Sequence, residues 1–319
     1  MRTARPLLSL LSLLAVLLAG CASPGAPVDP APIGTPQRPM PPNAVIGADV
    51  EGGGSGDSDC DPAASLSPNG AISAGSTMAE IKQRGYLKAG VDQNTFLFGF
   101  RDPTTGRLEG FDIDIAKEIA RAIFGDPDAI QFRAISSAQR DVALMNGDVD
   151  IVVRTYSITC QRLQKVGFST VYYVAGQRVL VKQNSQVGGI GDLGGKRVCA
   201  TKESTSLENI ANSEPKPVPV SVDDWSDCLV MLQQGQVDAV STDDTILAGM
   251  AEQDPTTKIV GDRFTEELYG VGIPKENEDM VRFVNAVLED IRGSAWKRSY
   301  DNWLRERLGP ASPPAPRYR

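Results

Sequence analysis

The sequence predicts an α/β protein of two lobes that are joined by two chain crossings and can close on each other as a hinged clamshell. Three observations favour this fold. Strands and helices alternate along the chain, which is typical of parallel sheets. An apolar strand followed at once by polar residues occurs in the segment 147–162 and again in 231–245. Extended segments at 168–182 and 269–273 have the positions expected of the two crossings.

The first lobe is expected to comprise residues 76–176 and 268–308. Its clearest helix is predicted over 110–124, where apolar residues recur on one helical face between Asp112 and the terminating Gly125. A buried strand is predicted over 149–153 because the run there is β-branched. The other predicted elements are a helix over 78–83, strands over 86–91 and 130–135, and closing helices over 279–291 and 295–308.

Phe96, Phe98 and Phe100 alternate directly after the first of these strands. This spacing indicates a half-buried strand. The alternative is that one of the three rings faces a ligand.

The second lobe is expected to comprise residues 177–267. Its predicted elements are strands over 197–200, 218–222 and 237–241, and helices over 205–212, 224–234 and 244–252. This order of strands and helices predicts a parallel sheet.

Polar side chains follow two of the apolar strands, at the edge where an open α/β sheet holds its ligand. Arg154, Thr155 and Ser157 follow the strand of the first lobe, and Arg162 lies just beyond them. Asp243 follows the strand of the second lobe. A ligand between them would carry an anionic group and an ammonium group, which describes an amino acid.

A further anion site is predicted where the strand 130–135 leads into a helix. Ser136 and Ser137 are good helix caps, and Arg140 follows within one turn. The alternative is that Arg140 is a solvated helix residue.

Composition excludes several classes of function. The chain has no histidine, which removes the commonest general base near neutral pH and the commonest metal ligand. The net charge of −8 becomes −10 when the two positive charges of Arg2 and Arg5 are removed with the leader, which argues against nucleic acid as a partner. We expect no catalytic residue, no metal and no cofactor.

The N-terminus has the pattern of a secretory signal, predicted over 1–20, with an apolar segment too short for a permanent membrane span. Residues 18–21 resemble a bacterial lipobox, which implies a lipid at Cys21; the alternative is an ordinary signal with a coincidental cysteine. Residues 21–75 are rich in proline and glycine and predict a flexible tether. Residues 309–319 predict a disordered tail.

Four cysteines remain after Cys21, and they allow three pairings. Cys199 lies in a predicted strand and Cys228 in a nearby predicted helix, so we expect these two to pair. Cys60 would then pair with Cys160, which would pin part of the tether to the folded body. Four free buried thiols are the alternative.

From about 78 to 308 the chain resembles the extracellular solute-binding proteins for polar amino acids, which are receptors of bacterial ABC importers. The motifs that carry the resemblance are GFDIDIAKEIA, the block from Gly147 that ends in VGFSTVYY, GKRVCATKESTS and VDAVSTDD. SSAQR and VVRTYSIT are most similar to the glutamate-binding branch, and the four mature cysteines resemble those of its actinobacterial lipoproteins. The resemblance implies a two-lobed clamshell of periplasmic-binding-protein type II.

The resemblance also implies roles for single residues. Arg162 would hold the ligand α-carboxylate, with Ser157, the Thr155 backbone and Thr205 assisting. Asp243 would pair with the α-ammonium group; Asp244 is the alternative if the loop is shifted by one residue. Phe96 would cover the ligand, with Thr95 as the alternative. Glu203 stands where the family usually has glycine, and Cys160 and Gln161 replace an acidic pair before the arginine.

Several more cations are expected near the cleft, at strand or helix ends: Arg140, Arg154, Lys202 and Arg101. Desolvating unpaired cations is costly unless an anion meets them. We therefore expect glutamate or aspartate rather than glutamine, with Arg140 the first candidate for the distal carboxylate and Lys202 the second. Glutamine and asparagine are the alternative ligands.

The expected function is reception of an acidic amino acid for an ABC permease, by a monomer that a lipid at Cys21 holds on the extracytoplasmic face of the bacterial cell membrane. One alternative is a sensor subunit that signals through a transmembrane partner. A second is a dehydratase on the same fold, which Asp243 disfavours because that carboxylate is expected to pair with ammonium.

Overall fold

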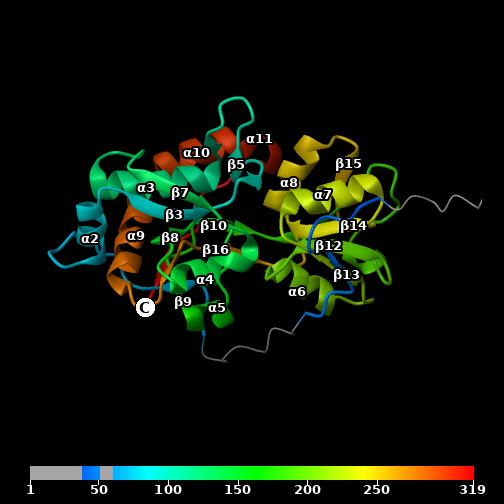
Figure 1. The fold of residues 1–319 in the computed structure, drawn as a ribbon, viewed down its shortest axis with the longest axis horizontal. Helices are drawn as coiled ribbons and strands as arrows, with labels where there is room; N and C mark the ends of the chain where they lie inside the picture. Colours follow the sequence, from blue (N-terminus) through cyan, green and yellow to red (C-terminus); the bar gives the residue numbers. More distant parts are fainter. Residues whose placement is uncertain (1–37, 51–59) are drawn as a thin grey trace, which may run out of the picture. The chain divides into compact units, whose positions relative to one another are not determined.

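The computed structural model describes residues 38–50 and 60–319. The expected signal over 1–20, the lipidation site Cys21 and part of the expected tether lie outside these residues. Residues 40–319 form one compact unit. Within this unit, each of two α/β lobes has its own sheet, and Figure 1 shows the lobes side by side.

The sheet of lobe 1 has the strand order β7-β3-β8-β17-β9. The central strand β3 (Leu87–Val91) pairs in parallel with β7 (Ile130–Ala134) and β8 (Ile151–Val152). The strand β17 (Gly272–Pro274) is antiparallel to both β8 and β9 (Val166–Phe168). A separate small sheet consists of β4 (Asn94–Thr95), β5 (Gly99–Arg101) and β6 (Leu108–Glu109).

The helices of lobe 1 pack on its five-stranded sheet or on one another. The helix α3 (Phe111–Phe124) buries the face that its periodicity predicts, and ends at Gly125 in a left-handed conformation. The others are α2 (Thr77–Arg84), α4 (Arg140–Met145) after a 3₁₀ turn (Ser137–Gln139), α5 (Cys160–Lys165), α9 (Glu278–Ile291), α10 (Ala295–Trp303) and α11 (Arg305–Leu308).

Lobe 2 has a mixed sheet, in the order β1-β13-β12-β14-β11-β15. The predicted parallel part is present, since β12 (Arg197–Thr201) is parallel to β13 (Val218–Val222) and to β14 (Ala239–Asp243). The strands β11 (Gln177–Lys182) and β15 (Thr257–Val260) are antiparallel additions. The helices are α6 (Thr205–Asn212), α7 (Trp225–Gln234) and α8 (Asp244–Gln253), with a 3₁₀ turn at Ile190–Asp192.

Two antiparallel strands, β10 (Tyr173–Ala175) and β16 (Glu267–Tyr269), join the lobes. In Figure 1 they lie in the middle, between the sheets of the two lobes. The chain passes through β10 on its way to lobe 2 and through β16 on its way back. The predicted two-lobed fold with two crossings is therefore confirmed.

Both predicted disulfides are present: Cys199–Cys228 joins β12 to α7, and Cys60–Cys160 joins the N-terminal segment to α5. The three phenylalanines do not form one strand. Leu97 has a positive φ of 76° and turns the chain between β4 and β5. The expected helix 295–308 is divided at Leu304 into α10 and α11.

The two chain ends differ from the expectation of a loose tether and a disordered tail. In the tether, β1 (Val45–Ile46) pairs with β13 of lobe 2. Further along, β2 (Ala64–Ser65) pairs with β18 (Arg317–Tyr318) of the tail. The reason is backbone pairing, which composition does not reveal: prolines flank these short strands without occupying them.

Candidate functional site in the cleft between the lobes

The cleft wall of lobe 1 is formed by the loop that follows β8. Because β8 is buried and ends at Val152, the next residues emerge at the sheet edge that faces lobe 2. Thr155, Tyr156 and Ser157 are buried in this loop. The loop ends at α5, whose N-cap Thr159 accepts a hydrogen bond from the Arg162 backbone N–H at 3.2 Å. The predicted strand, polar run and helix thus place Arg162 at the cleft.

Arg140 and Arg162 lie on the ring of Tyr156. The guanidinium carbon of Arg140 is 4.5 Å from the ring centroid, and that of Arg162 is 5.1 Å away. Both arginines are buried. Burial and the neighbouring arginines lower the pKa of Arg140 to about 9. The aromatic face stabilises the two cations without neutralising them, so the pair still favours an anion.

The two arginines reach across the cleft to one backbone oxygen of lobe 2. Arg162 Nη2 donates to the Glu203 carbonyl at 2.9 Å, and Arg140 Nη2 donates to the same oxygen at 3.1 Å. Glu203 precedes α6 and has a φ of +55°, which a glycine would adopt without strain. Glu203, which the resemblance places at a position where glycine is expected, is therefore a left-handed residue in contact with the arginines. Nearby, Thr201 Oγ1 donates to Ser137 Oγ at 3.0 Å, so the two lobes are joined here.

The opposite wall of the cleft carries carboxylates. Asp243 ends β14 and is buried; one of its oxygens accepts from the Tyr269 hydroxyl, and the other, Oδ1, has no hydrogen-bond partner among the described residues. Burial, and next the charge of Glu267, raise the pKa of Asp243 well above its usual range. A buried carboxylate oxygen without a partner is costly, so this atom favours a cationic donor.

Glu267 on the hinge strand β16 is a site residue that the sequence analysis missed. It is buried and accepts from Thr205 Oγ1 at 2.9 Å and from Asn209 Nδ2 at 3.3 Å. Thr205, expected at the ligand carboxylate, therefore bonds to Glu267 in this structure. Tyr156 and Tyr269 were also missed as site residues. Their place in the sequence could have identified them, because Tyr156 lies within the predicted polar run and Tyr269 begins the predicted second crossing.

Arg154 lies beneath the cleft wall, where its guanidinium group makes one ion pair and two hydrogen bonds. It pairs with Asp92 at 2.8 Å, donates from Nε to the Ile135 carbonyl at 2.7 Å, and donates from Nη1 to Ser137 Oγ at 2.7 Å. Its side chain is fully buried. Arg154 thus holds three segments of lobe 1 together behind the arginine pair.

Three other predicted site residues lie apart from the arginine pair. Lys202 pairs with Asp223 at 3.2 Å. Arg101 is exposed on β5 and donates to the Gly106 carbonyl at 2.7 Å. The Phe96 ring packs on Phe100 at 4.8 Å and faces a small pocket that α7 and α8 line. Of the surplus cations, Arg140 is the one that the fold brings to Arg162.

Ser157 and Thr155 support the arginines through their backbones. The Ser157 carbonyl accepts from Arg162 Nη1 at 2.7 Å. The Thr155 N–H donates to Asp112 Oδ2 at 2.7 Å, and its carbonyl lies 3.4 Å from Arg140 Nη1. Thr155 has a positive φ of 39°, so this part of the wall is held in an uncommon conformation.

A cavity of about 510 Å³ opens beside the arginine pair, lined by both lobes. Arg162, Ser137, Glu203 and Glu208 belong to its wall, and Val50 of the N-terminal segment contributes to its rim. We interpret this cavity as the entrance to the cleft.

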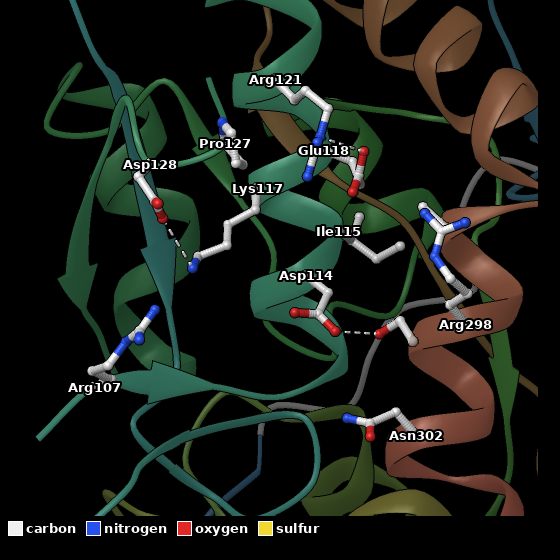
Figure 2. Close-up of a pocket in the computed structure, with 12 residues that line it drawn as sticks. Arg107, Asp114, Ile115, Lys117, Glu118, Arg121, Pro127, Asp128, Arg298 and Asn302 are labelled. Carbon is white, nitrogen blue, oxygen red and sulfur yellow. Dashed lines mark hydrogen bonds and ion pairs between the residues drawn. The ribbon is translucent and has the colours of Figure 1, made fainter. Parts of the chain in front are cut away.

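A second cavity, of about 550 Å³, lies on lobe 1 between α3 and α10, away from the cleft (Figure 2). Four of its charged side chains form two ion pairs: Lys117 pairs with Asp128 at 3.2 Å, and Arg121 with Glu118 at 3.2 Å. Asp114 accepts from Ser299 at 2.6 Å. We assign no ligand to this cavity.

Among the described helices, none has the length and apolar composition to cross a membrane. In the same residues, no cluster of cysteines and carboxylates has the composition of a metal site.

Residues 87–306 match the model of the bacterial extracellular solute-binding proteins, family 3. The chain is 38% identical over 232 residues to the glutamine-binding protein GlnH of an ABC transporter of Bacillus subtilis, covering 72% of this chain and 85% of that protein. It is 30% identical over 256 residues to the glutamate-binding protein GluB of Corynebacterium glutamicum, covering 76% and 85%.

Among solved structures, an ancestral arginine-binding protein bound to glutamine superposes with a TM-score of 0.64 at 33% identity, covering 71% of this chain and 99% of that one. The residues 87–306 that the family model matches include the sheets of both lobes, both crossings, and the arginines, carboxylates and hydroxyl residues described above in the cleft. The chain belongs to the bacterial extracellular solute-binding proteins of family 3.

Proposed function

We propose that this protein is a receptor that binds an amino acid in the cleft between its lobes and delivers it to an ABC permease. One observation carries the proposal. The Arg140 and Arg162 pair of lobe 1 donates to the Glu203 carbonyl of lobe 2, and Asp243 of lobe 2 has a buried oxygen without a hydrogen-bond partner among the described residues. Asp243 is near enough to Arg140 for the arginine charge to offset part of the rise in pKa that burial causes, so this region offers donors to a carboxylate and an acceptor to an ammonium group.

In this proposal Arg162 grips the ligand α-carboxylate and Asp243 binds the α-ammonium group. On binding, the ligand carboxylate replaces the Glu203 carbonyl as the hydrogen-bond acceptor of the two guanidinium groups. An arginine fork suits a carboxylate, because two parallel N–H groups can donate to its two oxygens. Contacts to both lobes favour the closed form, which is how binding is reported to the permease.

The ligand side chain decides between an acid and an amide. Arg154, Lys202 and Arg101 have other partners, so the expected surplus of cations reduces to Arg140. We propose that Arg140 meets the distal carboxylate of glutamate or aspartate and that these acids bind ahead of glutamine and asparagine. The relatives support glutamate and glutamine alike, since their names include both glutamine-binding and glutamate-binding proteins, so the preference for the acid rests on Arg140 alone.

Titration calorimetry with the four amino acids tests the ligand. The unaltered protein should bind glutamate more tightly than glutamine, and Arg140→Met should weaken glutamate binding about tenfold or more while changing glutamine binding less. Tighter binding of glutamine by the unaltered protein would overturn the acidic preference and leave amino-acid reception intact. Failure to bind any of the four would overturn reception itself.

Delivery to a permease is tested by uptake of the labelled ligand in cells that lack this protein. Loss of uptake, restored by the unaltered protein but not by Asp243→Asn, is expected. Normal uptake together with a lost transcriptional or metabolic response would favour the sensor function instead. Cys21→Ala should release the protein from the cell surface if the proposed lipid anchor is present.

A further inference from the structure

The segment that precedes the first helix of lobe 1 pairs with the C-terminal segment of the chain, and both lie on lobe 1. We call residues 60–70 and 309–319 the terminal clasp. Ala64 and Ser65 pair in parallel with Arg317 and Tyr318, and the Arg319 N–H donates to the Ser65 carbonyl at 2.9 Å. Arg317 also pairs with Asp61 at 2.6 Å. Residues at opposite ends of the sequence therefore form one small unit.

The N-terminal half of the clasp is fixed to lobe 1 through buried polar contacts. Ser65 Oγ donates to the Phe168 carbonyl of β9 at 2.9 Å. Asn285 of α9, which is fully buried, donates to Ser65 Oγ at 2.9 Å and to the Leu66 carbonyl at 2.7 Å. Buried hydrogen bonds of this kind are costly to break, so the clasp has a defined position.

The C-terminal half of the clasp is held by α9 as well. Arg292 donates to the Pro313 carbonyl at 3.0 Å, and the Tyr318 hydroxyl donates to Glu289 at 3.0 Å. These contacts explain how a proline-rich tail keeps one conformation.

The clasp is covalently joined to the helix that carries the ligand arginine. Cys60 forms its disulfide with Cys160, the first residue of α5, and Arg162 follows two residues later. The helix α5 has six residues. A helix this short gains little stability from its own hydrogen bonds, so its position depends on external contacts.

The clasp lies outside the residues that define the family, since the family match covers 87–306. The arginine helix is thus supported by segments outside the part of this chain that the family model matches. The other disulfide, Cys199–Cys228, lies in the core of lobe 2, where it joins β12 to α7 and bonds neither to the clasp nor to α5.

We propose that the terminal clasp, through Cys60 and Cys160, is a positioning element for Arg162 that sets the affinity for the ligand. This inference rests on the proposed function, in which Arg162 holds the α-carboxylate. Small displacements of a positioned charged group are costly, because its hydrogen bonds need correct distance and direction.

The test is a double-mutant cycle measured by titration calorimetry with glutamate and glutamine on the full chain. The variant C60A/C160A should raise the Kd about tenfold when residue 162 is arginine. In the Arg162→Lys background, which has no planar fork to position, the same change should raise the Kd less than about twofold. An equal effect in both backgrounds, or no effect in either, would overturn the proposal.

The matched control is C199A/C228A, which removes the lobe 2 disulfide and should leave the Kd within about twofold. If this control weakens binding as much as C60A/C160A, the effect is general destabilisation and the positioning role is refuted. Arg162→Lys alone separates the two proposals: if it leaves the Kd unchanged, the proposed function of Arg162 fails, whatever the clasp does.

A second variant keeps the test decisive if C60A/C160A does not fold. Ending the chain after Leu308 removes β18 and keeps both disulfides. We expect a higher Kd and faster hydrogen exchange in the backbone of 160–165, with exchange in α7 of lobe 2 unchanged. An unchanged Kd with unchanged exchange in 160–165 would refute the clasp as a positioning element.

Discussion

The guanidinium group of Arg154 and the carboxylate of Asp92 form an ion pair of 2.8 Å in which both side chains are buried. The pair lies directly beneath the wall that carries Arg140 and Arg162. Removing one partner would leave the other charge buried and unpaired, which costs far more than the loss of an exposed ion pair.

Arg154→Met should therefore lower the free energy of unfolding by about 3–5 kcal/mol, measured by urea denaturation. Arg101→Ala is the matched control, because this arginine is exposed; its effect should stay within about 0.5 kcal/mol. Neither variant should change the acid-over-amide preference unless it unfolds the lobe. A mild effect of Arg154→Met would mean that water reaches Asp92.

Ligand binding should release a proton from Asp243. Burial raises the pKa of this carboxyl, and the ligand ammonium group would favour its ionised form, so affinity should rise with pH until Asp243 is ionised in the unliganded protein. Calorimetry in two buffers of different ionisation enthalpy measures the number of protons that are released on binding. Asp243→Asn should abolish the release and weaken binding by about 2–5 kcal/mol. The control is Asp244→Asn, because the Asp244 carboxylate pairs with Arg263. This substitution should change neither the proton release nor the affinity.

Asp112 should make the stability of the protein fall as the pH rises. Burial raises the pKa of its carboxyl from 3.8 to about 7, although Tyr172 and the Thr155 N–H donate to it. Its stabilising contribution is then complete below pH 3.8 and is lost as the pH rises through about 7. Relative to Asp112→Asn, the unaltered protein should lose about 4 kcal/mol of its free energy of unfolding across this range. A pH-independent difference between the two would contradict the prediction.

Gly249 of α8 lies against the backbone of Phe96, and a methyl group there would collide with the Phe96 carbonyl. Because Phe96 comes from lobe 1 and α8 from lobe 2, Gly249→Ala should disfavour the closed form and weaken ligand binding by about 1–3 kcal/mol. Gly293→Ala is the control, since nothing lies near its added carbon. Calorimetry measures the affinity, and small-angle scattering measures the opening.

Much of the fold was predictable because periodicity reports burial directly. The helix α3 and the strands beside Arg162 and Asp243 were found in this way. The pair Cys199–Cys228 followed from the predicted elements, and Cys60–Cys160 followed by elimination. The boundaries of strands were harder to predict where the backbone conformation of one residue ends the strand, as the positive φ of Leu97 does between β4 and β5.

The partners of the polar residues could not be predicted. Arg154 and Arg162 follow the same strand, yet one is a structural ion pair and the other faces the cleft. The difference depends on Asp92, which is far away in the sequence and beside Arg154 in space. Glu267 was not predicted for a similar reason. Its role depends on Asp243 and Thr205, which are distant in the sequence and lie close to it in the fold.

The pairing of β2 with β18 also bears on how the protein is prepared. A sample trimmed to the boundaries of the family would begin after Cys60 and stop before Arg317, and would lose both strands together with the bond to Cys160. Such a sample would contain every cleft residue and could still report an affinity that is not that of the whole receptor.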